Sequence, residues 1–211
     1  MIADLGAGTG KLSRQLGERT HRVTSIDSSK EMLVAVSNHE PNVLPVVACV
    51  ERLPLRNSCM DAAVAGQSFH WFDAGPALAE IHRVLKPQGG LGLLWNRRDL
   101  ELEWVQHIES LVRPYRRDAP LWHQVDWTKV LASHSGFTAL QKQDFFWERA
   151  LTPEEVATTV SSRSYIAALS FDLRMQLMKK TTEAAAFYQR EDGSLCLPFT
   201  THAYWCFKAD E

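Results

Sequence analysis

A short glycine-rich segment near the start of the chain constrains the fold more than any other feature. Residues 4–10 read Asp-Leu-Gly-Ala-Gly-Thr-Gly; they overlap the end of an apolar run, Ile2 to Leu5, and precede a helical pattern that begins at Lys11. Glycines between a strand and a helix let backbone amides approach a ligand that a side chain would keep out. The segment therefore predicts a binding loop; the alternative interpretation is a tight turn without a ligand.

The first two thirds of the chain alternate short apolar runs with helical patterns, which is typical of successive βα units and a mainly parallel sheet. The predicted strands are Ile2 to Leu5, Val23 to Ile26, Val43 to Ala48, Asp61 to Ala65 and Gly90 to Trp95. The predicted helices run from about Lys11 to Glu18, Lys30 to Asn38 and Ala77 to Leu85. We expect the last helix to stop at residues 86–90, Lys-Pro-Gln-Gly-Gly, because proline and glycine end helices.

The pattern changes after the fifth predicted strand. The segments expected there are a helix from Glu101 to Tyr115, a proline-bounded loop, a helix from about Trp127 to Ser135 and a strand from Phe137 to Ala150. A helical insert is expected to begin at Pro153, with Thr152 as its N-cap, and to run in pieces to about Gln189. The Asp192-Gly193 turn then leads into a final strand, Leu195 to Phe207.

Length and composition favour one domain. The chain has 211 residues, of which 45% are hydrophobic, and this suffices for a sizeable core. We expect a single domain over residues 1–211, with a cofactor-binding core at 1–99, a helical, substrate-shaping region at 100–194 and a final strand at 195–208. The fold class is α/β.

Charge and hydropathy exclude several classes of protein. The 23 basic and 25 acidic residues give a net charge of −2 without a run of like charges, which argues against a nucleic-acid-coating surface. The longest apolar stretches are far shorter than the roughly 20 residues of a membrane-spanning helix, and the first residues lack the features of a signal peptide. We therefore expect a cytoplasmic protein. Four dispersed cysteines without a C-x-x-C pair are expected to be reduced, structural thiols.

The spacing of the glycines disfavours a nicotinamide dinucleotide as the ligand. A dinucleotide fingerprint reads G-x-G-x-x-G, whereas here the third glycine, Gly10, comes one residue earlier. An acid followed by G-x-G-x-G resembles the first motif of class I S-adenosylmethionine-dependent methyltransferases. The resemblance implies a Rossmann-like sheet and S-adenosylmethionine as cofactor. In that family the motif packs against the methionine part of the cofactor, which implies cofactor-binding roles for Asp4, Gly6, Gly8 and Gly10.

Two further residues fit this cofactor. Asp27 directly follows the second predicted strand, where such folds present an acid to the ribose hydroxyls. The alternative is a helix-capping aspartate that needs no ligand. Met32 resembles the apolar residue that flanks the adenine in this family, and a plain core role is the alternative.

The loops after the third and fourth predicted strands complete the expected cofactor site. Residues 48–55 resemble the family's adenine-reading loop, which implies roles for Cys49, Val50 and Glu51, although Glu51 is as readily explained as a solvated residue. Many relatives have Asp or Thr where Cys49 stands, so adenine recognition is expected to rest on the backbone of Val50 and to be weaker. Gln67 lies after the fourth strand, at the sheet edge where ligands bind.

The segments at 66–73 and 77–90 resemble the small-molecule branch of the family, which includes ubiquinone-biosynthesis and trans-aconitate-type methyltransferases. The resemblance covers about residues 1–99 well. Enzymes that methylate nucleic-acid amino groups carry an N/D-P-P-Y/F motif where this chain has Gly-Gln-Ser-Phe at 66–69. Catechol-type enzymes need an acidic cluster around a metal, and the sequence has no comparable set. The expected partner is thus a small molecule, without metal, nucleic acid or membrane.

Few catalytic residues are expected, because a sulfonium already makes its methyl group a strong electrophile. His70 is the best candidate general base, since the unperturbed pKa of histidine lies near neutrality. The alternative is a histidine that packs beside Phe69 and Trp71. Trp71 and Phe72 are candidate walls of the cofactor or substrate pocket, and a role as core residues is the alternative.

Three further residues are candidates for substrate binding. Arg97, next to Arg98, follows the fifth predicted strand, and one of the two is a candidate partner for a substrate carboxylate. The alternative is that both arginines lie on a solvent-exposed face without a ligand. Arg163 and Tyr165 lie in the helical insert, which often shapes the substrate pocket in this family.

The leading hypothesis is methyl transfer to an oxygen, carbon or nitrogen of a small molecule. Two alternatives are a catalytically silent S-adenosylmethionine-binding remnant and an NAD-dependent oxidoreductase. Because Met1 directly precedes the first predicted strand, we also expect an N-terminally truncated chain. Such a chain would show impaired activity and possible self-association through the face that the missing segment leaves bare.

Overall fold

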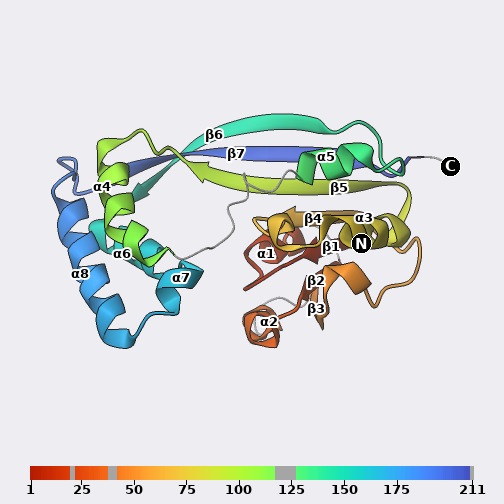
Figure 1. The fold of residues 1–211 in the computed structure, drawn as a ribbon, viewed down its shortest axis with the longest axis horizontal. Helices are drawn as coiled ribbons and strands as arrows, with labels where there is room; N and C mark the ends of the chain where they lie inside the picture. Colours follow the sequence, from red (N-terminus) through yellow and green to blue (C-terminus); the bar gives the residue numbers. More distant parts are fainter. Residues whose placement is uncertain (20–21, 38–41, 117–126, 210–211) are drawn as a thin grey trace. The chain divides into compact units, whose positions relative to one another are not determined.

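The computed structural model describes residues 1–19, 22–37, 42–116 and 127–209. Its strands form a seven-stranded sheet in the order β3-β2-β1-β4-β5-β7-β6 (Figure 1). The strands are β1 (Ile2–Leu5), β2 (Val23–Asp27), β3 (Val43–Val47), β4 (Met60–Gly66), β5 (Leu85–Arg98), β6 (Gln141–Leu151) and β7 (Leu195–Phe207). The strand order reverses between β1 and β4, and open α/β sheets bind their ligands at such a switch point.

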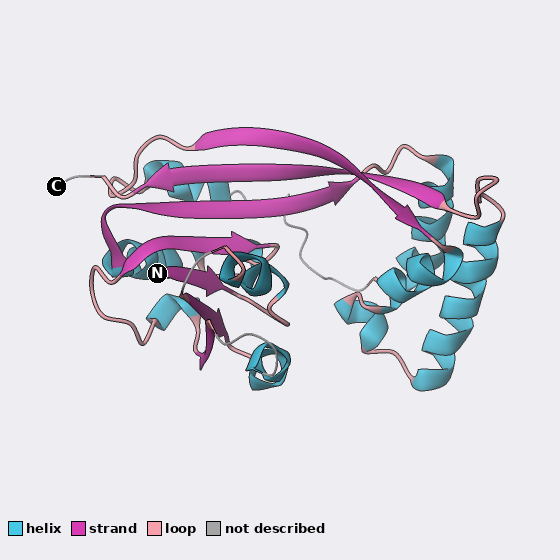
Figure 2. Ribbon diagram, turned by 180° about the vertical axis from the view of Figure 1, so that it is seen from behind, coloured by secondary structure: helices cyan, strands magenta, loops and turns pink. Residues whose placement is uncertain are grey.

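Parallel pairing prevails on the N-terminal side of the sheet. β1 pairs with β2 and β4, β2 with β3, and β4 with β5, all in parallel. β7 runs against β5, because Asp99 N donates to Pro198 O at one end while Lys208 N donates to Gly89 O at the other. In Figure 2 the arrowheads of these two strands point in opposite directions. The predicted α/β class, with a mostly parallel Rossmann-like sheet and a C-terminal antiparallel strand, is confirmed.

The helices follow the predicted segments closely. They are α1 (Lys11–Gly17), α2 (Lys30–Ser37), α3 (Ala74–Val84), α4 (Glu103–Val112), α5 (Trp127–Ser133), α6 (Pro153–Ser161), α7 (Ser164–Ala167) and α8 (Phe171–Ala186), with short 3-10 turns η1 (Val50–Arg52), η2 (Phe69–Trp71) and η3 (Arg113–Tyr115). Thr152 caps α6 as predicted, since its hydroxyl accepts from Glu155 N at 3.3 Å. Asn38, the predicted end of the second helix, and most of the predicted loop before Trp127 lie outside the described residues.

The third helix ends where it was predicted to end, but the strand that follows begins at Leu85 rather than at Gly90. The helix ends at Val84, and residues 86–90 belong to β5, which runs from Leu85 to Arg98. A Cβ on Gly89 would lie 2.9 Å from Lys86 O, so the glycine permits a close backbone approach inside the strand rather than a turn after a helix. The pairing of β4 with β5 shifts register at this point, which explains how a Pro-Gly-Gly segment fits into a strand.

Backbone contacts divide the chain into two compact units, each with its own core. The first unit comprises Met1–Trp95, Pro120–Asp144 and His202–Glu211, and the second comprises Asn96–Ala119 and Phe145–Thr201. In the first, apolar side chains of β1, β4, β5 and α3 pack together, and Trp95 stacks on Trp127 with ring centroids 4.6 Å apart. In the second, α4, α6 and α8 bury a separate apolar cluster. A single domain over 1–211 stays a prediction.

None of the helices in the described ranges combines the length and apolar character needed to cross a bilayer.

Candidate functional site

The carboxyl ends of β1, β2 and β4 meet at one edge of the sheet in the first unit. Leu5 pairs with Ile26, and Asp4 pairs with Val64, so the loops that follow these three strands start side by side. A hollow of about 460 Å³ lies there, within the roughly 300–1,000 Å³ range of ligand pockets. Its lining residues are Gly6, Gly8, Asp27, Ser28, Ser29, Met32, Ala48, Cys49, Val50, Glu51, Gln67, Ser68, Trp71 and Phe72.

The structure thus brings together all the residues predicted to bind a cofactor except Asp4 and Gly10, together with Trp71 from the predicted substrate set. Phe72, considered with Trp71 as a wall of the pocket, also lines the hollow, whereas sequence reasoning missed Ser28, Ser29, Ala48 and Ser68. Ser28 and Ser29 directly follow Asp27, so their position in the chain was a usable signal. Ser68 offered none, because it reaches the hollow only through the local conformation of the loop after β4.

The three glycines of the first loop have different structural roles. All have positive φ, at 65° for Gly6, 56° for Gly8 and 77° for Gly10. A Cβ on Gly6 would lie 2.5 Å from Ser68 Cβ, and one on Gly10 would lie 2.7 Å from Val36 Cγ2. A Cβ on Gly8 would meet no protein atom within 4 Å. Gly6 and Gly10 therefore serve the packing of the loop, whereas Gly8 leaves space open in the hollow.

Asp27 is held in place by backbone amides from two loops. Its Oδ2 accepts from Gly8 N and its Oδ1 from Ser29 N, both at 2.8 Å. The side-chain hydroxyl of Ser29 in turn accepts from Met32 N at 3.2 Å in the first turn of α2. Each carboxylate oxygen still has a lone pair for a further donor. Asp27 therefore binds the backbone at the start of α2, and its carboxylate can still accept hydrogen bonds from the hydroxyl groups of a ligand.

Asp4 lies behind this loop rather than in the hollow. Its side chain is buried, with 1% exposed, and its Oδ2 accepts from Ser13 Oγ at 2.5 Å. Ser13 accepts in turn from Ser25 Oγ at 2.5 Å, so the chain of contacts joins β1, α1 and β2. Burial raises the pKa of Asp4 from 3.8 to about 6, partly offset by the Ser13 hydrogen bonds and reinforced by the charge of Asp27. The predicted contact of Asp4 with a cofactor stays a prediction.

This raised pKa makes stability depend on pH in a definite direction. Between pH 4 and 6 the unfolded chain ionises Asp4 more readily than the folded chain, so the free energy of unfolding falls as pH rises. The shift from 3.8 to about 6 corresponds to roughly 3 kcal/mol at about 1.4 kcal/mol per tenfold change in affinity for the proton. From pH 4 to pH 7, the free energy of unfolding of Asp4→Asn should rise by about 2–3 kcal/mol relative to that of the wild type. Urea unfolding at each pH measures this difference. A pH-independent difference would contradict the assignment.

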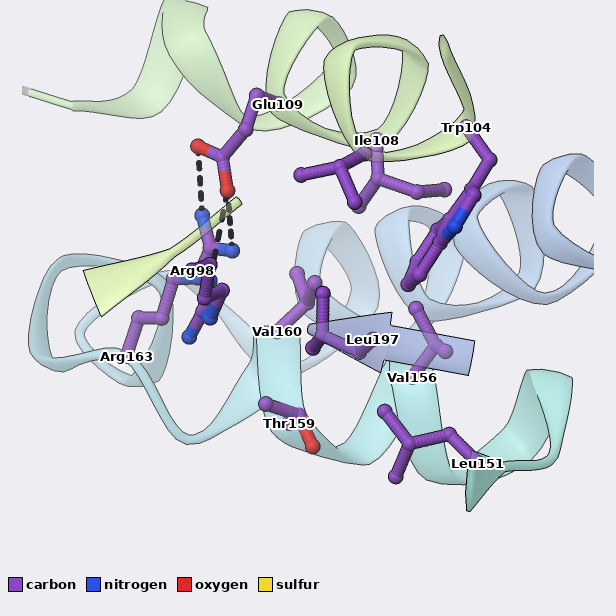
Figure 3. Close-up of a pocket in the computed structure, with 11 residues that line it drawn as sticks. Arg98, Trp104, Ile108, Glu109, Leu151, Val156, Thr159, Val160, Arg163 and Leu197 are labelled. Carbon is purple, nitrogen blue, oxygen red and sulfur yellow. Dashed lines mark hydrogen bonds and ion pairs between the residues drawn. The ribbon is translucent and has the colours of Figure 1, made fainter. Parts of the chain in front are cut away.

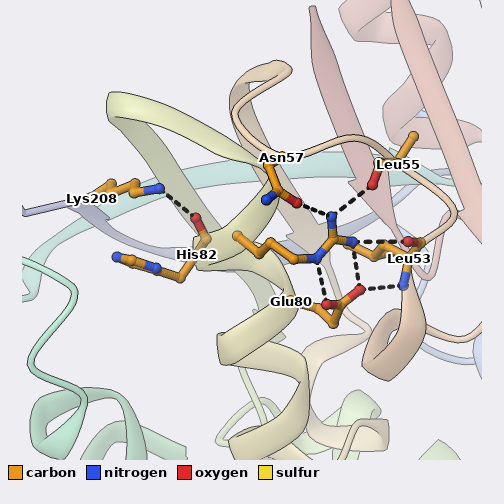
Figure 4. Close-up of polar contacts among 7 residues, drawn as sticks. Leu53, Leu55, Asn57, Glu80, His82 and Lys208 are labelled. Carbon is orange, nitrogen blue, oxygen red and sulfur yellow. Dashed lines mark hydrogen bonds and ion pairs between the residues drawn. The ribbon is translucent and has the colours of Figure 1, made fainter.

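The loop after β3 is fixed to α3 by an arginine-centred network (Figure 4). Arg83 donates to both carboxylate oxygens of Glu80 at 2.7 and 2.8 Å, and also to the carbonyl oxygens of Leu53 and Leu55. Glu80 accepts from Leu53 N at 2.7 Å, and its pKa is lowered mainly by the hydrogen bond from Arg83. The network therefore holds the segment that follows η1 at the edge of the hollow.

Glu51 extends this attachment. Its Oε1 accepts from Asp73 N at 2.9 Å, directly before α3. Cys49 is exposed, whereas Val50 is buried, and both line the hollow beside Glu51. The structure therefore gives Glu51 a clear structural partner, while a contact of Cys49, Val50 or Glu51 with a cofactor stays a prediction.

The loop after β4 has a strained backbone at the hollow. Gln67 has a φ of 60°, which is uncommon for a residue with a side chain and is frequent at functional sites. Ser68 Oγ donates to Leu5 O at 2.6 Å and so ties this loop to the end of β1. The strained residue is thus held over the switch point of the sheet.

His70 stands beside the hollow and is not among its lining residues. Its ring lies 5.1 Å from the ring of Trp71, which is 57% exposed and does line the hollow. Within the described part of the chain, His70 Nδ1 is buried without a hydrogen-bond partner. Burial lowers the pKa of His70, so the ring is neutral near pH 7. Its role as a base stays a prediction.

The remaining predicted substrate residues belong to the second unit. Arg163 and Tyr165 contact each other at 3.1 Å, and Arg163 binds both carboxylate oxygens of Glu109. Arg97 lines a different hollow, of about 690 Å³. Arg98, one of the two arginines considered for a substrate carboxylate, lines that hollow and also the cavity at Arg163, whereas Glu109 was not singled out from sequence. The contact between Glu109 of α4 and Arg163 of the helical insert could not be predicted from sequence, because the two residues lie 54 positions apart.

A metal site is not indicated among the residues that the structure describes, since no group of three or more His, Cys, Asp or Glu side chains is placed to hold an ion. The absence of a metal therefore stays an expectation.

Comparisons with known proteins agree on one family. Residues 3–93 match the family described as "Methyltransferase domain". The chain is 34% identical over 186 residues to an uncharacterized methyltransferase-like protein of Schizosaccharomyces pombe, across 88% of this chain and 72% of that protein. A proposed type II methyltransferase from Anaeromyxobacter dehalogenans has the same fold, with a TM-score of 0.72, 21% identity, and 97% and 88% of the two chains covered.

A more distant structure was solved with a ligand. Phosphoethanolamine N-methyltransferase 2 of Haemonchus contortus, in complex with S-adenosyl-L-methionine, matches with a TM-score of 0.56 and 16% identity, over 99% of this chain and 48% of that one. At these identities the structural likeness shows the fold.

Proposed function

Because this chain belongs to the methyltransferase family, we propose that it transfers a methyl group from S-adenosylmethionine to a small-molecule acceptor. The observation that carries this proposal is the hollow at the switch point of the sheet, where Gly8 leaves open space beside the carboxylate of Asp27. A glycine that no protein atom crowds, next to an acid with spare lone pairs, is the arrangement expected for a ligand that carries a ribose.

The residues present fit S-adenosylmethionine. Asp27 would accept hydrogen bonds from the two ribose hydroxyls, and the amides of the Gly6 to Gly8 loop would approach the methionine part. Met32, which is 48% exposed at the hollow, would flank the adenine together with Val50. When bound, the cofactor supplies an electrophilic methyl group. The protein then has to align the acceptor and, for a hydroxyl acceptor, remove a proton.

A small molecule fits this chain better than a nucleic acid. The net charge of −2 and the lack of a run of basic residues in the sequence argue against binding of a phosphate backbone. We assign His70 as the candidate base, because its neutral ring stands at the carboxyl end of β4 next to Trp71.

Release of S-adenosylhomocysteine across a panel of small hydroxyl, amine and carbon acceptors tests this function. We expect release that depends on one acceptor class and saturates with S-adenosylmethionine. If the protein binds S-adenosylmethionine but releases no product with any acceptor, the catalytically silent alternative is correct.

Gly8→Ala should separate ligand binding from folding. The added Cβ enters the open space of the hollow, so we expect roughly five- to tenfold weaker binding of S-adenosylmethionine, about 1–1.4 kcal/mol. Gly10→Ala places a side chain at a similarly positive φ, and its Cβ would also clash with Val36. Its main expected effect is therefore a lower melting temperature. Calorimetric titration and thermal unfolding of both variants provide the comparison. An affinity unchanged by Gly8→Ala would place the cofactor elsewhere.

A further inference from the structure

Two arginines of the second unit share a single carboxylate (Figure 3). Arg163 binds Glu109 through both terminal nitrogens, at 2.6 Å to Oε1 and 3.1 Å to Oε2. Arg98, from the end of β5, reaches the same Oε1 at 3.4 Å. Tyr165 adds a hydroxyl at 3.1 Å from Arg163, but no charge. Glu109 therefore has a strong partner in Arg163 and a weak one in Arg98.

The cluster carries one positive charge more than its carboxylate can balance. The side chains are largely removed from water, with 12% of Arg163 and 28% of Arg98 exposed. Arg163 Nε is buried and has no hydrogen-bond partner among the described residues. The pKa of Arg98 is lowered by burial and by the charge of Arg163. Because an excess positive charge at a partly buried site and a buried, unsatisfied donor both cost stability, a second anion would complete the cluster.

An apolar cavity adjoins these guanidinium groups. It is narrow, about 20 Å³, and Ile108, Val160 and Leu197 stand in its wall beside the arginines in Figure 3. The remaining lining residues are Trp104, Val105, Glu109, Leu151, Val156 and Thr159. A space of this size accepts little more than one or two small groups. Arg98 also lines the wider hollow of about 690 Å³, so the arginine side of the cavity is open to a ligand.

We propose that the second unit binds a short-chain monocarboxylate, whose carboxylate accepts hydrogen bonds from Arg98 and Arg163 and whose apolar end enters the cavity beside Ile108 and Val160. The guanidinium groups supply the charge and fork geometry that suit a carboxylate. The narrow apolar wall favours an unbranched chain over a ring. This site concerns the second unit alone and does not depend on the proposed methyl transfer.

Butyrate is the probe for this site, and n-butanol is its uncharged counterpart. Titration of the full chain, followed through the NMR methyl signals of Ile108 and Val160, should show saturable shifts with butyrate and roughly tenfold weaker binding of n-butanol. Arg98→Gln removes the excess charge without breaking the Arg163–Glu109 pair, so the variant is expected to fold and to bind butyrate roughly tenfold more weakly. Arg113→Gln, which removes the same charge from an exposed position in this unit, should leave binding unchanged.

Two outcomes would overturn the proposal: the absence of saturable methyl shifts with butyrate, or equal effects of the two arginine variants. Calorimetry with S-adenosylmethionine on the same samples reports on the first unit independently. A failure of the carboxylate site is thereby distinguished from a failure of the proposed function.

Discussion

Replacing His70 with alanine is expected to lower turnover on a hydroxyl acceptor roughly 100-fold, while affinity for S-adenosylmethionine stays nearly unchanged. His70 stands at the carboxyl end of β4, where its ring contacts Trp71 at the hollow. Burial lowers its pKa, so the basic, neutral form persists to lower pH than in an ordinary histidine. The rate of the wild type should therefore fall only below this lowered pKa, and the alanine variant should lose that pH dependence.

A matched variant separates proton removal from packing. His70→Asn keeps a polar side chain in the same space but has no basic nitrogen, so it should bind S-adenosylmethionine as the wild type does and remain slow. Steady-state rates and calorimetry on both variants give the comparison. Equal losses of affinity and turnover in the alanine variant would instead assign His70 to the structure of the pocket.

Asp27→Ala is expected to weaken binding of S-adenosylmethionine at least tenfold. Two charge-assisted hydrogen bonds to the ribose, each roughly 1.5–3 kcal/mol, would disappear. The carboxylate also accepts hydrogen bonds from Gly8 N and Ser29 N, both at 2.8 Å. The same change therefore releases the glycine loop and the start of α2. Both effects act on the cofactor site, whereas the core of the sheet is untouched.

The conservative control for this position is Asp27→Asn, which retains one acceptor oxygen of the same shape. It should fall between the wild type and Asp27→Ala in calorimetric affinity, because one loop contact and one ribose contact survive. A dissociation constant unchanged in the alanine variant would refute the ribose assignment.

The parts of the fold that sequence could predict are those set by local chemistry. The strand at Ile2–Leu5, the glycines after it and the acid after Val23–Ile26 each carry their signal within a few residues. Parallel pairing then brings their carboxyl ends to one edge, so most of the hollow's lining could be predicted. The capping of α6 by Thr152 follows from the same kind of local pattern.

Contacts between distant segments could not be predicted in this way. Gly6 packs so closely against Ser68 that a side chain would clash, although the two residues lie 62 positions apart in the sequence. Asp4 is likewise buried beside Ser13 and Ser25, which come from α1 and β2. The pairing of Arg163 with Glu109 likewise spans 54 residues. The early start of β5 at Leu85 could not be predicted either, because proline and glycine disfavour strands and only the shifted register with β4 accommodates residues 86–90.

The most direct test of the cofactor assignment is calorimetric titration of the protein with S-adenosylmethionine and, separately, with NAD. The hollow at Asp27 and Gly8, with its G-x-G-x-G spacing, predicts saturable one-to-one binding of S-adenosylmethionine and no measurable binding of NAD. Binding of NAD without binding of S-adenosylmethionine would contradict the account.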